Sequence, residues 1–207
     1  GLIRWVLPMV PQGIEEYGYI LIVLSVISIL YASFISIVQK DFKYLIAYSS
    51  IAHMGLISAG IIACNAQSLQ GSLMEMLSHG INTVGLFFVL DIIFLRMGTS
   101  EMKQLGGIRG LDSSFAFLFF IIVLSVVALP FTNGFVGEFL SLAGIYQTSS
   151  LVALICTTGI ILGAAYMLYL YRRVAFGGQV NADAAAMRDI SAREWVMMAP
   201  IAAAVMW

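Results

Sequence analysis

The fold is decided by residues 113–145, which read SSFAFLFFIIVLSVVALPFTNGFVGEFLSLAGI. A bilayer core about 30 Å thick needs roughly 20 apolar residues in a helix that rises 1.5 Å per residue. This stretch is about ten residues too long for one straight crossing, and Pro130 and Gly134 interrupt it near its middle. It either turns back as two short pieces or crosses once as a broken helix. In both cases Glu138 lies beside a disrupted backbone in an apolar run, where membrane proteins place ion and proton sites.

The composition indicates a polytopic membrane protein. Hydrophobic residues make up 61% of the 207 residues and charged residues 10%, whereas about a quarter of a soluble domain is charged. The net charge of -1 argues against nucleic acid as a partner and leaves the lipid bilayer as the expected surroundings. Cys64 and Cys156 lack CxxC spacing, and we expect neither a metal nor a cofactor in this chain.

Hydrophobic run lengths predict an all-α transmembrane helix bundle that forms a single domain over residues 1–207. Gly1 lies inside an apolar run and Trp207 closes another, so we expect a fragment of a longer chain. The expected spans are 1–11 (partial), 17–38, 44–66, 70–95, 113–145 (broken), 151–170 and 194–207 (partial).

Loop charge decides between the two topologies of residues 113–145. If every segment crosses once, nine basic residues fall on one side and none in the turns on the other, as the positive-inside rule requires. A double crossing would place the last four of them opposite the other five. The single broken crossing is therefore predicted from Lys40, Lys43, Arg96, Lys103, Arg109, Arg172, Arg173, Arg188 and Arg193.

Glu138 is the strongest candidate for a functional residue. The crossing direction places Pro130 near the midplane and Glu138 about 12 Å further toward the outer face, at 1.5 Å per residue. An ionised carboxylate in hydrocarbon costs several kcal/mol, so Glu138 is expected to face water, a cavity or a partner. The alternative is a carboxylate that reaches the outer interface near Tyr146.

Two histidines fall near the middle of their spans. His79 follows Glu75 by four residues, which places both on one helix face and lets them share a proton or a hydrogen bond. Histidine titrates nearest to physiological pH, so His53 and His79 are candidate proton relays; the alternative is a neutral imidazole hydrogen-bonded between helices. A two-histidine metal site is not expected, because no cysteine or carboxylate constellation in the sequence completes it. Asp91 is expected to pair with a loop lysine or arginine.

Four motifs occur in this order: DFKYLIAYSSIAHMG at 41–55, SHG at 78–80, GG at 106–107 and PFTNGFVGEF at 130–139. Together they resemble the antiporter-like membrane subunits of respiratory complex I, over essentially the whole chain. The resemblance implies fourteen core helices with two inverted five-helix repeats, of which this chain runs from late in the eighth helix into the fourteenth. Residues 113–145 would be the broken twelfth.

The resemblance also implies roles for individual residues. His53 and His79 match histidines of the family's central polar axis, and Glu138 matches the carboxylate that ends the second half-channel, where sister subunits carry lysine. The family's central lysine should lie just before Gly1, and the glutamate and lysine pair of the first repeat is absent.

The function implied is proton translocation in an NADH:quinone oxidoreductase, in the bacterial cytoplasmic membrane or the mitochondrial inner membrane. Other membrane-arm subunits would be the partners, and NAD, FMN, iron–sulfur clusters and quinone would belong to partner subunits. Two alternatives remain open. One is a cation/proton antiporter or membrane-bound hydrogenase subunit on the same scaffold, and the other is a scaffolding helix bundle that only assembles partners.

Overall fold

The computed structural model describes residues 1–108, 113–178 and 190–206. Within these ranges the chain is helical, and the single extended pairing is an isolated bridge between Asp41 and Glu101. The predicted all-α bundle is confirmed. Its elements are η1 (Leu2–Val6), α1 (Leu7–Met9), α2 (Pro11–Val38), α3 (Phe42–Ile62), α4 (Ala66–Met97), α6 (Ser113–Val126), α7 (Asn133–Thr148), α8 (Ser150–Phe176) and α9 (Ala192–Val205).

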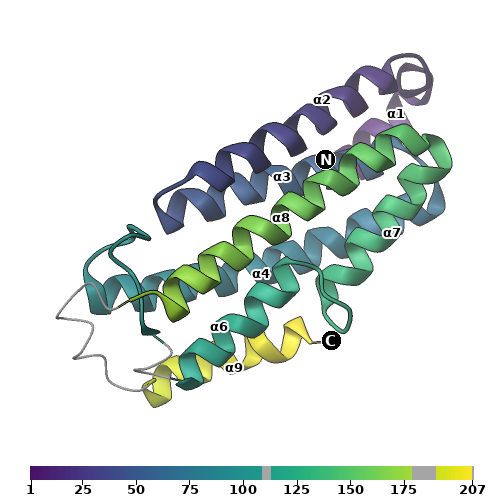
Figure 1. The fold of residues 1–207 in the computed structure, drawn as a ribbon. Helices are drawn as coiled ribbons and strands as arrows, with labels where there is room; N and C mark the ends of the chain where they lie inside the picture. The colour runs from purple at the N-terminus through teal and green to yellow at the C-terminus, as the bar shows by residue number, and fades with distance from the viewer. Residues whose placement is uncertain (109–112, 179–189, 207) are drawn as a thin grey trace.

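Four helices, α2, α3, α4 and α8, are long and apolar enough to cross a membrane. Helices α6 and α7, with 14 and 16 residues, are each too short. Figure 1 shows that α6 begins at the end of the bundle where α4 finishes, and that α7 finishes at the opposite end. Residues 113–145 therefore form one broken crossing, as the loop charges predicted.

The break lies at residues 127–132 and contains Pro130. Ala128 and Phe131 have positive φ angles of 54° and 76°, which few non-glycine residues adopt. Gly134 belongs to the first turn of α7, and a Cβ atom there would collide with the carbonyl oxygen of Ser125. The glycine is needed because the chain folds back against the end of α6.

Glu138 lies early in α7, shortly after the break. The distance of about 12 Å assumed helical rise from Pro130 onward, but α7 begins only at Asn133. Five helical residues separate Asn133 from Glu138, which corresponds to about 7.5 Å. The remaining part of the predicted 12 Å falls on residues 130–133, which lie in the break and the first residue of α7, so the depth of Glu138 stays a prediction.

The expected spans 1–11 and 17–38 leave residues 12–16 between them as a turn, but these residues are helical. Pro11 is the first residue of α2, and the chain bends one residue earlier at Val10, with φ -133° and ψ 53°. Proline is accepted at the first helical position because its missing N–H would have no intrahelical partner there. Glu15 and Glu16 therefore lie in the first turns of α2 rather than in a loop.

Helix α4 begins four residues before the predicted span at 70–95. Asn65 accepts a hydrogen bond from the Ser68 backbone N–H, and the Ser68 side chain caps Asn65 in return. This capping box supplies partners for backbone groups at the start of a helix, which explains why Ala66 is already helical.

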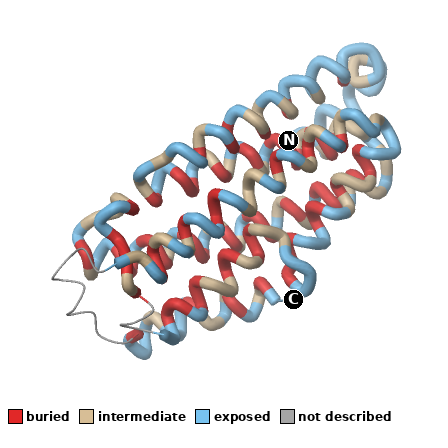
Figure 2. Tube along the Cα trace, in the orientation of Figure 1, coloured by how far each residue is buried: buried red, intermediate tan, exposed pale blue. Residues whose placement is uncertain are grey.

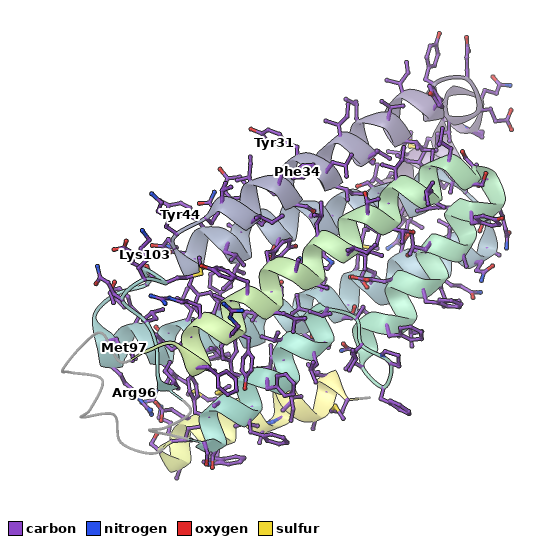
Figure 3. The ribbon with its side chains drawn as sticks, viewed as in Figure 1. Tyr31, Phe34, Tyr44, Arg96, Met97 and Lys103 are labelled. Atoms are coloured by element: carbon purple, nitrogen blue, oxygen red, sulfur yellow. The ribbon has the colours of Figure 1, made fainter. Side chains whose placement is uncertain are left out.

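Arg96, in the last turn of α4, and Lys103, in the segment that follows α4, lie at the same end of the bundle (Figure 3). Arg173 donates to the backbone oxygens of Met102 and Lys103 at 3.2 and 2.9 Å. Arg96 Nη2 lies 2.7 Å from Glu194 Oε2 and so joins α4 to α9. Arg109 and Arg188 lie outside the described residues.

Buried and exposed residues alternate along the helices, as expected when one side of each helix packs inside the bundle (Figure 2). Helices α4 and α7 make the most extensive contact. A Cβ atom on Gly71 or Gly144 would collide with the facing backbone, and one on Gly137 would stand 2.6 Å from the Glu75 backbone nitrogen. Small residues let two backbones approach closely, and here they bring the helices that carry Glu75 and Glu138 together.

Candidate functional site

His53 of α3 lies between two buried carboxylates. Its Nδ1 atom is 3.4 Å from Glu75 Oε1 on α4 and 3.4 Å from Glu138 Oε1 on α7. Glu75 is 2% exposed and Glu138 is 5% exposed, so Glu138 does not reach the outer interface. Among the described residues, no lysine or arginine forms an ion pair with either carboxylate. The positive charge that can lie beside these carboxylates within the described residues is therefore a protonated His53.

Glu75 is held in place from its own helix. The Ser78 hydroxyl lies 3.1 Å from the Glu75 backbone oxygen and 3.2 Å from Oε2. With Oε2 occupied by a hydroxyl, Oε1 is left to face His53. The expectation that Glu75 would act with His79 on its own helix was incomplete, because its nearest imidazole comes from α3.

His79 packs against the ring of His53. The two ring centroids are 4.9 Å apart at an interplanar angle of 29°, and His79 Nε2 lies 3.4 Å from Thr83 Oγ1. His79 is 7% exposed. The structure therefore brings together the four titratable residues singled out from the sequence, which come from three different helices.

Small cavities lie on two sides of His53. One is lined by His53, Glu138 and Tyr166, and leaves about 20 Å³ for the centre of a water molecule. The other is lined by His53, Glu75 and His79, and leaves about 10 Å³. One ordered water needs about 10–15 Å³ of such space and two to four polar partners. The cluster thus has room for single waters beside it.

Sequence reasoning missed a polar group at the helix break. The Ser125 hydroxyl lies 2.9 Å from Asn82 Oδ1 and 2.8 Å from Asn133 Oδ1, and Asn133 Nδ2 donates to the Ala204 backbone oxygen at 3.1 Å. One hydroxyl has one proton, so one of the two amides must present its NH₂ to Ser125. Asn133 already donates to Ala204, which makes Asn82 the donor. The sequence signal that could have indicated this polar group is Asn133, an amide three residues after Pro130.

The structure also bears on the predictions for the helix break, for Asp91 and for a metal site. Pro130 lies within the break, and Gly134 lies just after it. Asp91 forms no ion pair with a described lysine or arginine and instead shares a surface pocket with Lys43. A metal site was not expected, because no carboxylate constellation in the sequence completed it. The structure supplies such carboxylates, since ligand atoms of His53, Glu75 and Glu138 lie within 4.8 Å of one another.

The fold and the site together define a polytopic helical membrane protein with a carboxylate–histidine cluster beside a broken helix. Residues 1–163 match the family described as "NADH:quinone oxidoreductase/Mrp antiporter, TM". The chain belongs to this family, as the four sequence motifs had indicated.

Its relatives include named subunits of respiratory enzymes. The chain is 43% identical to NADH-quinone oxidoreductase subunit M of Rhodobacter capsulatus, over 98% of this chain and 40% of the relative. It is 38% identical to NADH-ubiquinone oxidoreductase chain 4 of Marchantia polymorpha, over 100% of this chain and 42% of the relative. The chain thus spans about two fifths of the length of these relatives.

Solved structures share the fold. A chain of respiratory complex I from Thermus thermophilus with bound NADH superposes with a TM-score of 0.92 at 29% identity, over 99% of this chain and 43% of that chain. A chain of an archaeal membrane-bound sulfane sulfur reductase has a TM-score of 0.85 at 22% identity, over 92% of this chain and 32% of that chain. The second likeness concerns the fold alone.

Proposed function

We propose that this chain is part of a proton-translocating membrane-arm subunit of an NADH:quinone oxidoreductase. The observation that supports this most is the cluster of His53, Glu75 and Glu138, which buries two carboxylates at one imidazole. Burying uncompensated charge costs several kcal/mol, so the protonation of such a cluster responds to any nearby change of charge. That response is what coupling a distant reaction to proton transfer requires.

In this mechanism a proton travels along His79 and His53 to Glu138, with Glu75 in support. The ring contact between the histidines and the two 3.4 Å separations allow transfer through short rotations or single waters. The proton leaves Glu138 toward the outer face when a neighbouring charge changes. Quinone reduction and NADH oxidation would take place in partner subunits, which hold NAD, FMN, iron–sulfur clusters and quinone.

The broken helix supports this role for Glu138. Interrupting a membrane helix leaves backbone groups that need polar partners, and here the Thr132 hydroxyl donates to the Leu129 backbone oxygen at 2.7 Å. Beside the break, Asn82 and Ser125 line a cavity together with the cluster residues His53, Glu75 and His79. The site is therefore polar at a depth where the helix surfaces are apolar. Other membrane-arm subunits are the proposed partners in the bilayer.

The experiment is Glu138→Gln in the full-length protein within its complex, with Glu16→Gln as the control because Glu16 is an exposed glutamate of α2. Proton pumping in vesicles should be lost in the first variant and retained in the second. Normal pumping by an assembled Glu138→Gln complex would remove Glu138 from the mechanism.

The family description also includes Mrp antiporters, which favours cation/proton antiport as a second candidate. Sodium-dependent proton movement in vesicles without NADH would support it over the redox-coupled pump. A scaffolding role predicts something else: Glu138, His53 and His79 could all be replaced by neutral residues without loss of coupled proton uptake.

A further inference from the structure

We infer that Glu75 is a second proton carrier, and that it exchanges one proton with Glu138 through a single atom, Nδ1 of His53. This inference rests on the proposed function and assigns a step within it. It begins from the two equal separations of 3.4 Å between this nitrogen and the two Oε1 atoms. A ring nitrogen carries at most one hydrogen, so it can serve one carboxylate at a time.

The ring of His53 is held in the orientation that this exchange needs. The ring of His79 stacks on it at 4.9 Å, and the two carboxylates approach the same nitrogen from different helices. A relay that uses both nitrogens of an imidazole must turn the ring over after each transfer. Because entry and exit share Nδ1 here, no ring flip is required.

Glu75 is placed as a partner in transfer rather than as a helix-packing residue. Its Oε2 atom lies 3.2 Å from the Ser78 hydroxyl, and its Oε1 atom faces His53. Gly137 lets α7 come against Glu75, since a Cβ atom there would stand 2.6 Å from Oε2. The carboxylates of Glu75 and Glu138 are thereby held at the same nitrogen.

The proton balance of the step is simple. Glu75 starts as a carboxylic acid, His53 as the neutral tautomer with its hydrogen on Nε2, and Glu138 as a carboxylate. The Glu75 O–H bond breaks as the Nδ1–H bond forms, which leaves an imidazolium between two carboxylates. The Nδ1–H bond then breaks as the Glu138 O–H bond forms, and His53 returns to its starting tautomer.

The test compares Glu75→Gln, Glu138→Gln and the control Glu16→Gln in the full-length protein within its assembled complex. Glu75→Gln should lower the rate of proton uptake by at least about tenfold, since acid–base groups contribute about 10²–10⁴-fold. Infrared difference spectra should show a protonated-carboxyl band that is lost in Glu75→Gln and kept in Glu138→Gln. Glu75→Asp should recover part of the uptake.

The outcomes separate this inference from the proposed function. Loss of uptake in Glu138→Gln with normal uptake in Glu75→Gln overturns the role of Glu75 and leaves the pump intact. Normal uptake in both overturns the pump as well. If Glu75→Gln does not assemble, Glu75→Asp and the infrared spectrum of the Glu138→Gln complex decide: absence of the protonated-carboxyl band in that spectrum refutes the proposal.

Discussion

Gly137 of α7 lies directly against Glu75 of α4, so closely that a Cβ atom on the glycine would stand 2.6 Å from the glutamate's backbone nitrogen. This contact sets the distance between the two helices at the depth of the carboxylates. Any added atom at this position must push α7 away from α4.

Gly137→Ala should therefore destabilise the protein by about 1–3 kcal/mol, the usual range for overpacking a tight contact. Thermal unfolding of the full-length protein in detergent measures the loss. Gly80→Ala is the matched control, because nothing lies within 4 Å of a Cβ atom at that helical position. Equal melting temperatures for the two variants would contradict the close contact.

Asn133→Ala should loosen the helix break. It removes one of the two partners of the Ser125 hydroxyl and the side-chain partner of the Ala204 backbone oxygen. Losing a partner of a buried polar group costs about 1–3 kcal/mol. Hydrogen exchange should speed up at residues 127–133 and in α9. Gln147→Ala removes only an exposed amide contact with Gln67 and should leave exchange at the break unchanged; faster exchange in both variants would argue against a specific link.

Arg96 and Glu194 should show energetic coupling across the bundle. Their side chains, 2.7 Å apart, are 17% and 23% exposed, and partly screened pairs contribute up to about 1 kcal/mol. A double-mutant cycle with Arg96→Ala and Glu194→Ala isolates this energy from the capping contacts of Glu194 with Ser191. The coupling energy between Arg96 and Glu194 should fall as the salt concentration is raised. A coupling energy near zero at low salt would contradict the predicted ion pair.

Tyr166→Phe should slow proton uptake without unfolding the protein. Tyr166 is 2% exposed and lines a cavity with His53 and Glu138, where its hydroxyl can hold a water. Losing one hydrogen bond of about 0.5–1.5 kcal/mol corresponds to a fall of about two- to tenfold. Tyr169→Phe, on the exposed side of the same helix, is the control, and equal rates in the two variants would exclude Tyr166 from the path.

Much of the fold was predictable because the bilayer imposes it. Span length located the long helices, and loop charge distinguished one broken crossing from two. The errors came from local backbone effects. Residues 12–16 are polar enough for a turn, yet Pro11 begins a helix there, and α4 begins four residues before the expected span because Asn65 and Ser68 cap it.

The site was predictable residue by residue but not as a constellation. His53, His79 and Glu138 stood out because charge and imidazole are rare at mid-membrane. Their mutual distances depend on how α3, α4 and α7 pack, which spacing along one chain does not specify. Glu75 was paired with His79 because four residues separate them, whereas in the structure its Oε1 atom lies 3.4 Å from Nδ1 of His53 on the neighbouring helix α3.

The helix break also has an electrical consequence. Glu138 lies ten residues before the end of α7, which is about 15 Å, or half the thickness of a bilayer core of about 30 Å. A proton that reaches Glu138 from the basic face has crossed about half of the membrane field. Moving one proton through the whole field costs about 2.3 kcal/mol per 100 mV. Protonation of Glu138 from the basic face and release of that proton to the outer face would therefore both depend on the membrane voltage, with about half of the total dependence in each step.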